Sequence, residues 1–148
     1  MFAKTIKKPI IIFLITIFLT LFTSACDNEQ SQILFNKYPF STETLNSTSN
    51  IFKTNDRIYY LVTLPKPVTT KKLYIQIVKT GGKTIAGDSA DRLGYDLVWT
   101  KRVKLKDEQI YYFTDYVVFS ETGVYIMKVY SQDNPTKILT SSQFYVRN

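Results

Sequence analysis

The fold of this chain is decided by one alternating stretch, Arg57-Ile58-Tyr59-Tyr60-Leu61-Val62-Thr63-Leu64. From Ile58 onward every second residue is aliphatic or aromatic, which is the spacing that puts side chains on one face of a β-strand. Pro65 and Pro67 end the strand, because proline has no N–H to donate to a neighbouring strand. We therefore expect a strand at residues 57–64. Its core-facing residues are Ile58, Tyr60, Val62 and Leu64.

Similar strand-length runs continue from this stretch toward the C-terminus. The chain has eleven tyrosines and ten phenylalanines against five glycines and five prolines. This balance favours strands, since aromatic residues suit a pleated, half-buried surface. The further strands that we expect span residues 72–79, 95–105, 110–119, 124–131 and 138–146. Toward the core we place Leu73, Ile75, Ile77, Met127 and Phe144, with Trp99 as an anchor.

Turn signals separate these runs. Thr80-Gly81-Gly82-Lys83 predicts a tight hairpin turn, because glycine tolerates the positive φ that such turns need. Its Gly-Lys-Thr sequence is not a phosphate-binding loop, since Ile77 replaces the first glycine and no helix follows. Asn134-Pro135 indicates a loop before the last strand. About seven short strands in about a hundred residues predict an all-β domain, an immunoglobulin-like antiparallel β-sandwich.

A second motif supports this fold. Glu121-Thr122-Gly123-Val124-Tyr125-Ile126-Met127 resembles the tyrosine corner of immunoglobulin-like domains. The resemblance implies that Tyr125, Met127 and Val129 point inward and that the Tyr125 hydroxyl bonds to backbone near the preceding turn. Glu121 stands where aspartate is usual, and Met127 takes the place of a cysteine. The resemblance therefore implies no disulfide between the sheets.

The N-terminus carries an export signal. Lys4, Lys7 and Lys8 precede an apolar run at residues 10–22, which is too short to span a bilayer comfortably. Ser24, Ala25 and Cys26 then resemble the lipobox of bacterial lipoproteins, although Thr23 stands where an aliphatic residue is commonest. The resemblance implies cleavage before Cys26 and lipid attachment to its thiol. The protein would then be anchored to the membrane of the cell envelope, facing away from the cytoplasm.

Asp27 and the following residues refine this organisation. An aspartate after the lipidated cysteine resembles the inner-membrane retention signal of enteric bacteria, which slightly favours the inner over the outer membrane. We interpret residues 1–25 as the signal peptide, residues 26–50 as lipidated N-terminus and tether, and residues 51–148 as the sandwich. Within the tether, the apolar residues 33–40 are expected to pack on the domain, for example as a first edge strand, with a partner-docking peptide as the alternative.

Charge and residue usage restrict the function. Three of the nineteen Lys and Arg precede residue 26 and all twelve acids follow it, so the remaining 123 residues carry a side-chain charge of +4. This favours anionic lipid or acidic partners only weakly, and nucleic acid is not expected for an exported chain. The chain has no histidine, which excludes Ser-His-Asp and Cys-His catalysis and histidine zinc sites. No cofactor or metal is expected.

Two weaker chemical alternatives rest on carboxylates. Paired acids could hydrolyse a glycosidic bond, and the loop at residues 87–96 could hold calcium. A solvated loop accounts for most of these acids without any chemistry, and the loop does not match the common calcium spacing. We therefore expect no catalytic residue. The acids considered are Asp88, Asp91, Asp96 and Asp115.

A basic stripe and a set of outward tyrosines are the remaining surface features. Arg102, Lys104 and Lys106, next to Lys101, are interpreted as a solvated edge strand whose cations discourage edge-to-edge pairing. Contact with anionic lipid or an acidic partner is the alternative. Aromatic sheet faces are typical of partner-binding surfaces. The tyrosines that we expect to face outward and bind a partner are Tyr59, Tyr74, Tyr130 and Tyr145.

Together these features predict a lipid-anchored, non-enzymatic interaction or assembly module with an envelope protein partner. The alternative is a domain that binds an envelope polysaccharide, with outward tyrosines and Trp99 as stacking platforms. Aromatics grouped beside polar side chains would favour the polysaccharide. A broad apolar and aromatic patch would favour the protein partner.

The lipobox makes a prediction that mass spectrometry can test. We expect the native protein to begin at Cys26, to carry a mass increase consistent with a diacylglycerol, and to partition with membranes. Cys26→Ala should abolish both the mass increase and membrane retention. Retention of residues 1–25 with an unmodified thiol would contradict the lipoprotein interpretation.

Overall fold

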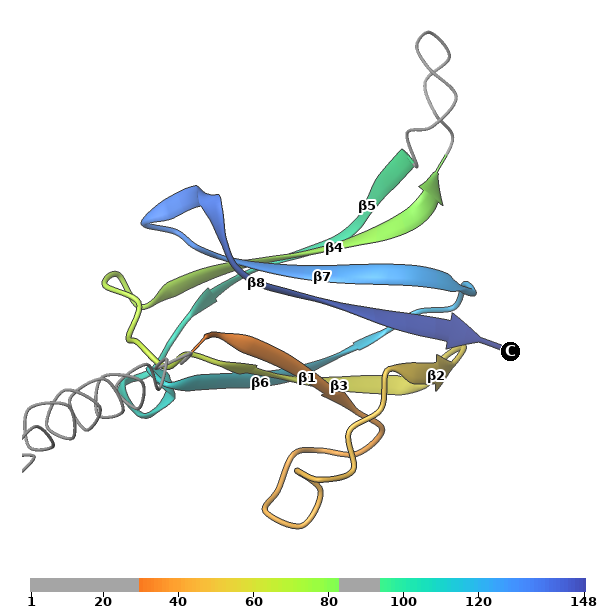
Figure 1. Ribbon diagram of the computed structural model, residues 1–148, viewed down its shortest axis with the longest axis horizontal. Coiled ribbons are helices and arrows are strands. Elements are labelled where there is room, and N and C mark those ends of the chain that lie inside the picture. Colours follow the sequence, from red (N-terminus) through yellow and green to blue (C-terminus); the bar gives the residue numbers. More distant parts are fainter. Residues whose placement is uncertain (1–29, 83–93) are drawn as a thin grey trace, which may run out of the picture.

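Two β-sheets face each other across one apolar core in the computed structural model, which describes residues 30–82 and 94–148 (Figure 1). The three-stranded sheet has the order β1-β3-β6 and the five-stranded sheet the order β2-β8-β7-β4-β5. All pairings are antiparallel except that of β2 with β8. The strands are β1 (Gln32–Asn36), β2 (Ile51–Lys53), β3 (Arg57–Thr63), β4 (Lys72–Gly82), β5 (Gly94–Lys104), β6 (Tyr112–Val118), β7 (Gly123–Ser131) and β8 (Asn134–Arg147).

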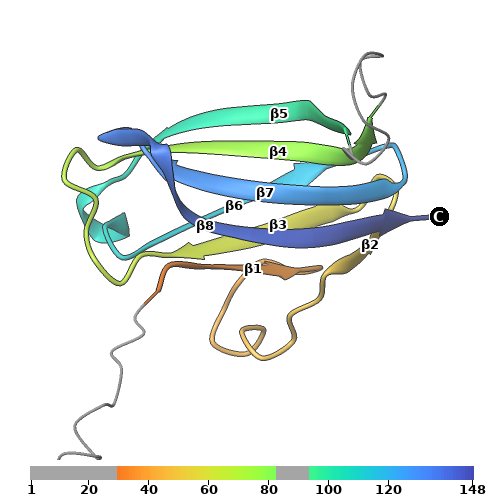
Figure 2. The same ribbon diagram turned by 45° about the horizontal axis from the view of Figure 1, so that its top comes forward.

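This arrangement confirms the predicted all-β sandwich. The one helix in the described part of the chain is the short 3-10 turn η1 (Asp107–Gln109), and no helix there is long and apolar enough to cross a membrane. The pairing of β2 with β8 differs from the predicted antiparallel pattern. It arises because β2 follows a loop at the edge of the sandwich and runs alongside the last residues of β8, as Figure 2 shows.

The core contains the residues that strand alternation assigns to it. Ile58, Tyr60 and Val62 of β3 have no exposed surface, and Leu64 is 1% exposed. Met127 and Phe144 also have no exposed surface, and neither do the inward residues of β4, which are Leu73, Ile75 and Ile77. Trp99 lies opposite Ile77 in the register of β5 with β4 and packs, half-buried, against this core. The period of two in the sequence therefore identifies the buried faces.

The sandwich begins at β1 and so starts before residue 51, the boundary predicted from the sequence. Ile33 and Phe35 are buried, and β1 pairs with β3 along its whole length (Figure 2). Residues 41–50 look like a linker by composition but form a loop that hydrogen bonds tie to β1. The buried Asn36 side chain donates to the Thr44 carbonyl at 2.8 Å, and the Ser49 N–H donates to the Phe35 carbonyl at 2.9 Å.

The chain does not turn at Thr80-Gly81-Gly82-Lys83 as predicted. β4 continues to Gly82, which lies opposite Gly94 of β5, and Lys83 lies outside the described residues. Gly81 does have the positive φ, 90°, that the sequence indicated. The register of β4 with β5 shifts between Thr80 and Gly82. The positive φ of Gly81 therefore belongs to an irregularity in the strand pairing and not to a hairpin turn.

The basic stripe lies on an edge strand, as predicted. β5 is the last strand of its sheet, with Val103 and Leu105 buried on one side and Arg102 and Lys104 exposed on the other. Lys101 instead faces the opposite sheet and pairs with Asp115 of β6. This ion pair links the two sheets along the side of the sandwich that β5 and β6 form.

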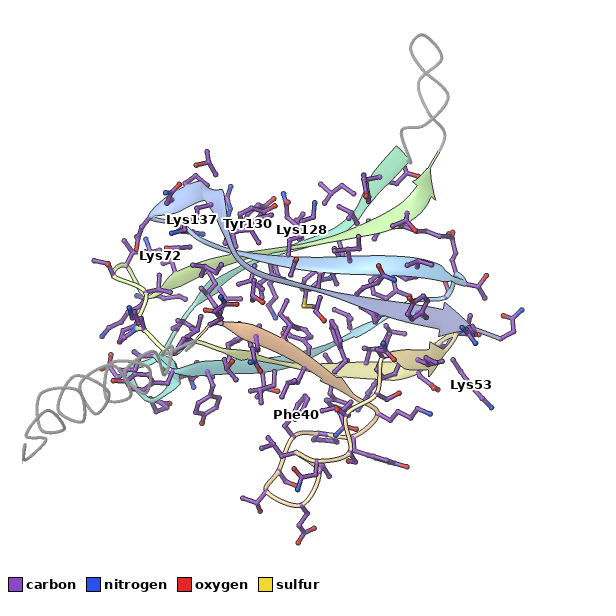
Figure 3. The ribbon with its side chains drawn as sticks, in the orientation of Figure 1. Phe40, Lys53, Lys72, Lys128, Tyr130 and Lys137 are labelled. Atoms are coloured by element: carbon purple, nitrogen blue, oxygen red, sulfur yellow. The ribbon has the colours of Figure 1, made fainter. Side chains whose placement is uncertain are left out.

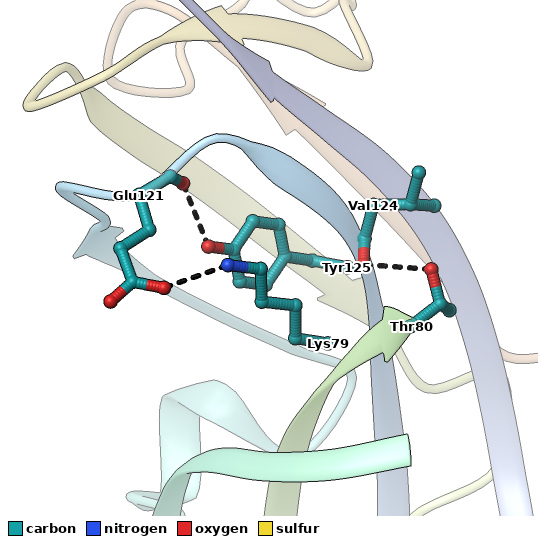
Figure 4. A network of polar contacts seen from close by, with 5 residues as sticks. All are labelled: Lys79, Thr80, Glu121, Val124 and Tyr125. Atoms are coloured by element: carbon teal, nitrogen blue, oxygen red, sulfur yellow. Dashed lines mark hydrogen bonds and ion pairs between the residues drawn. The ribbon is translucent and has the colours of Figure 1, made fainter. Parts of the chain in front are cut away.

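The tyrosine corner has the geometry that the motif implies (Figure 4). The hydroxyl of Tyr125, which is 1% exposed, donates to the Glu121 carbonyl at 2.8 Å. The Glu121 carboxylate accepts a hydrogen bond from Lys79 at 2.7 Å, which lowers the pKa of that carboxyl. A Cβ at Gly123 would lie 2.7 Å from Cε of Lys79. Glycine at this position therefore lets Lys79 pass over the corner and reach Glu121.

Tyr60 is the contrasting case. Its hydroxyl is buried without a hydrogen-bond partner among the described residues. Burial, with a smaller contribution from Asp115, raises the pKa of this hydroxyl far above its ordinary value. A buried hydroxyl without a partner opposes folding, whereas a bonded one supports it.

These two tyrosines predict opposite effects of the same substitution. Tyr125→Phe should lower the free energy of unfolding by about 1 kcal/mol, because the Glu121 carbonyl loses its donor. Tyr60→Phe should leave it unchanged or raise it by up to about 1 kcal/mol, because no bond is lost. Urea unfolding of the two variants measures both effects, with Tyr112→Phe on the surface as control. Equal destabilisation by both would contradict these environments.

The Lys79–Glu121 pair predicts a dependence on pH. Because the folded-state pKa of Glu121 is lowered, its contribution is present above the unfolded pKa, about 4.3, and is lost as the pH falls through the folded value. Glu121→Gln should therefore be less stable than the native protein near neutral pH, and the difference should shrink at about pH 3. Urea unfolding at the two pH values measures this. A difference independent of pH would contradict the assignment.

Candidate functional site

The predicted outward tyrosines lie on two opposite faces of the sandwich. Tyr59 is on the outer face of the three-stranded sheet. Tyr74, Tyr130 and Tyr145 are on the outer face of the five-stranded sheet. All four are half-buried. The structure therefore brings Tyr74 together with Tyr130 but separates both from Tyr59.

We call the outer surface of the three-stranded sheet the tyrosine face. Tyr59 lies directly opposite Tyr116, with ring centroids 5.7 Å apart, and the Arg57 guanidinium carbon lies 5.0 Å from the Tyr116 ring centroid. Tyr112, Tyr116 and Val118 of β6 are between 44% and 47% exposed. The tyrosine face consists of Gln32, Leu34, Asn36, Arg57, Tyr59, Leu61, Thr63, Tyr112, Thr114, Tyr116 and Val118.

Uncharged residues dominate the tyrosine face. Arg57 is its single charged residue, and Asp115 of the same strand faces the other sheet, where it pairs with Lys101. Half-exposed aromatic rings beside aliphatic and threonine side chains form a surface that can lose water at low cost. Such a composition, depleted in charge, is typical of the centre of protein interfaces.

The outer surface of the five-stranded sheet is chemically different. Tyr74 lies opposite Tyr130, with ring centroids 6.1 Å apart, and its hydroxyl accepts a hydrogen bond from Gln76 at 3.2 Å. A shallow hollow of about 340 Å³ adjoins this pair, lined by Tyr74, Arg102, Gln132 and Pro135. Figure 3 shows Lys72, Lys128 and Lys137 around Tyr130.

Tyr145 lies away from this pair, near the C-terminal end of β8. It is opposite Val124 at the start of β7, whereas Tyr130 is near the end of β7. Its hydroxyl accepts a hydrogen bond from Gln143 at 2.6 Å, and the Arg147 guanidinium carbon lies 5.8 Å from its ring centroid. Tyr145 therefore shares the sheet face with Tyr74 and Tyr130 but not their immediate site.

The acids considered for chemistry are not brought together where the structure describes them. Asp96 lies opposite Lys79 in the register of β5 with β4, and Asp115 pairs with Lys101. Asp88, Asp91 and most of the possible calcium loop lie outside the described residues, as does Cys26. Within residues 30–82 and 94–148, no three acidic or cysteine side chains cluster to hold a metal ion.

Sequence reasoning missed Tyr112 and Tyr116, which are the most exposed rings of the tyrosine face. The signal was available, because residues 112–118 alternate strictly. Phe113, Asp115 and Val117 point inward, and the residues between them point outward. What the sequence alone lacks is the pairing of β6 with β3, which sets Tyr116 beside Tyr59.

No protein-family model matches the chain, and no curated protein matches it. Among solved structures, it is similar to the soluble domain of PmoD from Methylocystis sp., with a TM-score of 0.46 and 14% identity over 79% of this chain and 90% of that one. It is also similar to superoxide reductase (neelaredoxin) from Ignicoccus hospitalis, with a TM-score of 0.43 and 10% identity over 80% and 81%.

A third similar structure is a CARDB domain from Pyrococcus furiosus, solved in complex with di-metal ions, with a TM-score of 0.32 and 12% identity over 80% of this chain and 88% of that domain. With identities this low, none of the three transfers a reaction, a metal or a partner to this chain.

Proposed function

We propose that the protein is a lipid-anchored lipoprotein of the cell envelope whose β-sandwich is a non-enzymatic docking module for another envelope protein. The tyrosine face is the observation that carries the docking proposal. It offers three tyrosines, Tyr59, Tyr112 and Tyr116, around aliphatic residues and a single cation. Tyrosine and arginine are the residues that most often dominate protein-binding energy.

The composition of this face favours a protein over a sugar. It is broad and spans all three strands, and no carboxylate lies on it. Its two side-chain amides are confined to β1 at its edge, where the buried Asn36 amide already bonds to the Thr44 carbonyl and Gln32 lies at the start of the strand. Sugar hydroxyls need such groups as hydrogen-bond partners, whereas an apolar protein surface does not. Docking would bury Tyr112 and Tyr116, which are now nearly half exposed, and would pair Arg57 with an acceptor of the partner.

The start of β1 supports a position close to the membrane. Gln32 is six residues after Cys26, and six residues span at most about 20 Å. β1 starts at the end of the sandwich that carries the β3–β4 and β7–β8 connections (Figure 1). A lipid on Cys26 would hold that end near the bilayer. The tyrosine face would then stand beside the membrane, within reach of a neighbouring membrane protein.

Photocrosslinking in the native host tests this proposal. We expect p-benzoylphenylalanine at position 112 to give one discrete adduct with an envelope protein. The same amino acid at position 136, an exposed residue of β8 on the other sheet, should give no such adduct. Adding Tyr116→Ala should weaken partner binding roughly thirtyfold, the loss typical of truncating a central interface tyrosine, and remove the adduct at position 112.

Two results would contradict the proposal. One is the same set of adducts from positions 112 and 136. The other is an adduct at position 112 that persists after Tyr116→Ala. Urea unfolding of the Tyr116→Ala variant serves as the control for folding, because a surface substitution should change the unfolding midpoint little.

A further inference from the structure

The outward rows of β4, β5 and β7 carry charge of one sign, and Asp133, an acid near Lys72 in the turn between β7 and β8, accepts a hydrogen bond from the Thr70 N–H at 3.2 Å. The residues of β4, β5 and β7 alternate in and out, and the outward positions near Tyr74 and Tyr130 include four cations. Asp96 is the one acid of β5, and it lies opposite Lys79. The Lys79 side chain lies over the ring of Tyr125, which faces inward, so this pair is not part of the outward row. The cationic face, as we call it, comprises Lys72, Tyr74, Gln76, Arg102, Lys104, Lys128, Tyr130 and Gln132.

We propose that the cationic face binds an acidic polysaccharide, with the Tyr74–Tyr130 pair and Arg102 at the centre of the site. This site is on the opposite side of the sandwich from the tyrosine face. The proposal therefore does not depend on the proposed docking function, and the two can fail separately.

The aromatic pair supplies the platform. Gln76 donates to the Tyr74 hydroxyl and so holds the ring along the sheet, with Tyr130 on the next strand at 6.1 Å. Sugar rings stack their C–H groups against such aromatic surfaces. The hollow lined by Tyr74, Arg102, Gln132 and Pro135 offers a recess next to this platform. Gln132 lies at its border, where an amide can bond to sugar hydroxyls.

The charges supply the selectivity for acidic sugars. Arg102 lies opposite Tyr74 and borders the hollow, where its guanidinium can bind a carboxylate through two parallel hydrogen bonds. Lys72 lies opposite Lys104 two residues along the strands from Tyr74 and Arg102, and Lys128 lies opposite Gln76. Lys72, Lys104, Arg102 and Lys128 thus occupy three neighbouring strands of one face, where an extended polymer with repeated carboxylates would meet more than one cation. A flat lipid surface would leave the recess unfilled.

Calorimetry with oligogalacturonate and oligomannuronate as probes tests the proposal. We expect the full-length protein to bind at least one of them, and to bind its fully methyl-esterified form, which lacks the charges, at least about tenfold more weakly. Tyr74→Ala and Arg102→Gln should each reduce affinity about tenfold or more, the loss expected for a charge-assisted hydrogen bond or a stacking contact. Tyr116→Ala and Arg57→Gln, the matched substitutions on the tyrosine face, should not change it.

Several outcomes would overturn this assignment. Failure of both oligosaccharides to bind excludes an acidic polysaccharide of uronic type. Equal binding of poly-glutamate, or of phosphatidylglycerol vesicles by the protein with Cys26→Ala, would show that the face responds to charge alone. Unchanged affinity in Tyr74→Ala, with an unchanged urea unfolding midpoint, would exclude the aromatic pair from the site.

Discussion

The structure depends on one row of side chains from each strand being buried between two sheets. Tyr60, Met127 and Phe144 are among the residues of this layer with no exposed surface. Phe144 packs against Phe35 and Tyr125, with ring centroids 4.9 and 5.4 Å apart, and so joins three strands from the two sheets. Without an internal disulfide, this apolar layer holds the domain together. The opposite rows of the strands form the outer faces of the two sheets.

The two outer faces use that freedom in different ways. The tyrosine face has a single cation among aromatic and aliphatic residues, whereas the cationic face surrounds its tyrosine pair with lysine and arginine. Aromatic residues occur on both faces. The charge of the neighbouring residues therefore decides which kind of ligand each face can bind. A neutral face suits a surface that also loses water on contact, and a charged face suits a ligand that stays partly hydrated.

Two ion pairs at the margins of the sandwich have structural roles. Lys101 and Asp115 link β5 to β6 across the sheets, and Lys79, Glu121 and Tyr125 close the turn before β7. The acids of these two pairs, which could otherwise have been read as reactive groups, are engaged with lysines.

The sequence by itself determined the all-β class, the buried row of each strand and the tyrosine corner, because alternation and turn chemistry are local properties of the backbone. The predicted strands therefore agree with β3 to β8 apart from a few terminal residues, the largest difference being that β8 begins at Asn134 and not at residue 138. Only the tertiary structure decided that β1 pairs with β3, that Tyr116 lies beside Tyr59, and that Tyr74 lies beside Tyr130. Strand order and register join residues far apart in the chain, and a pattern with a period of two is compatible with many such pairings.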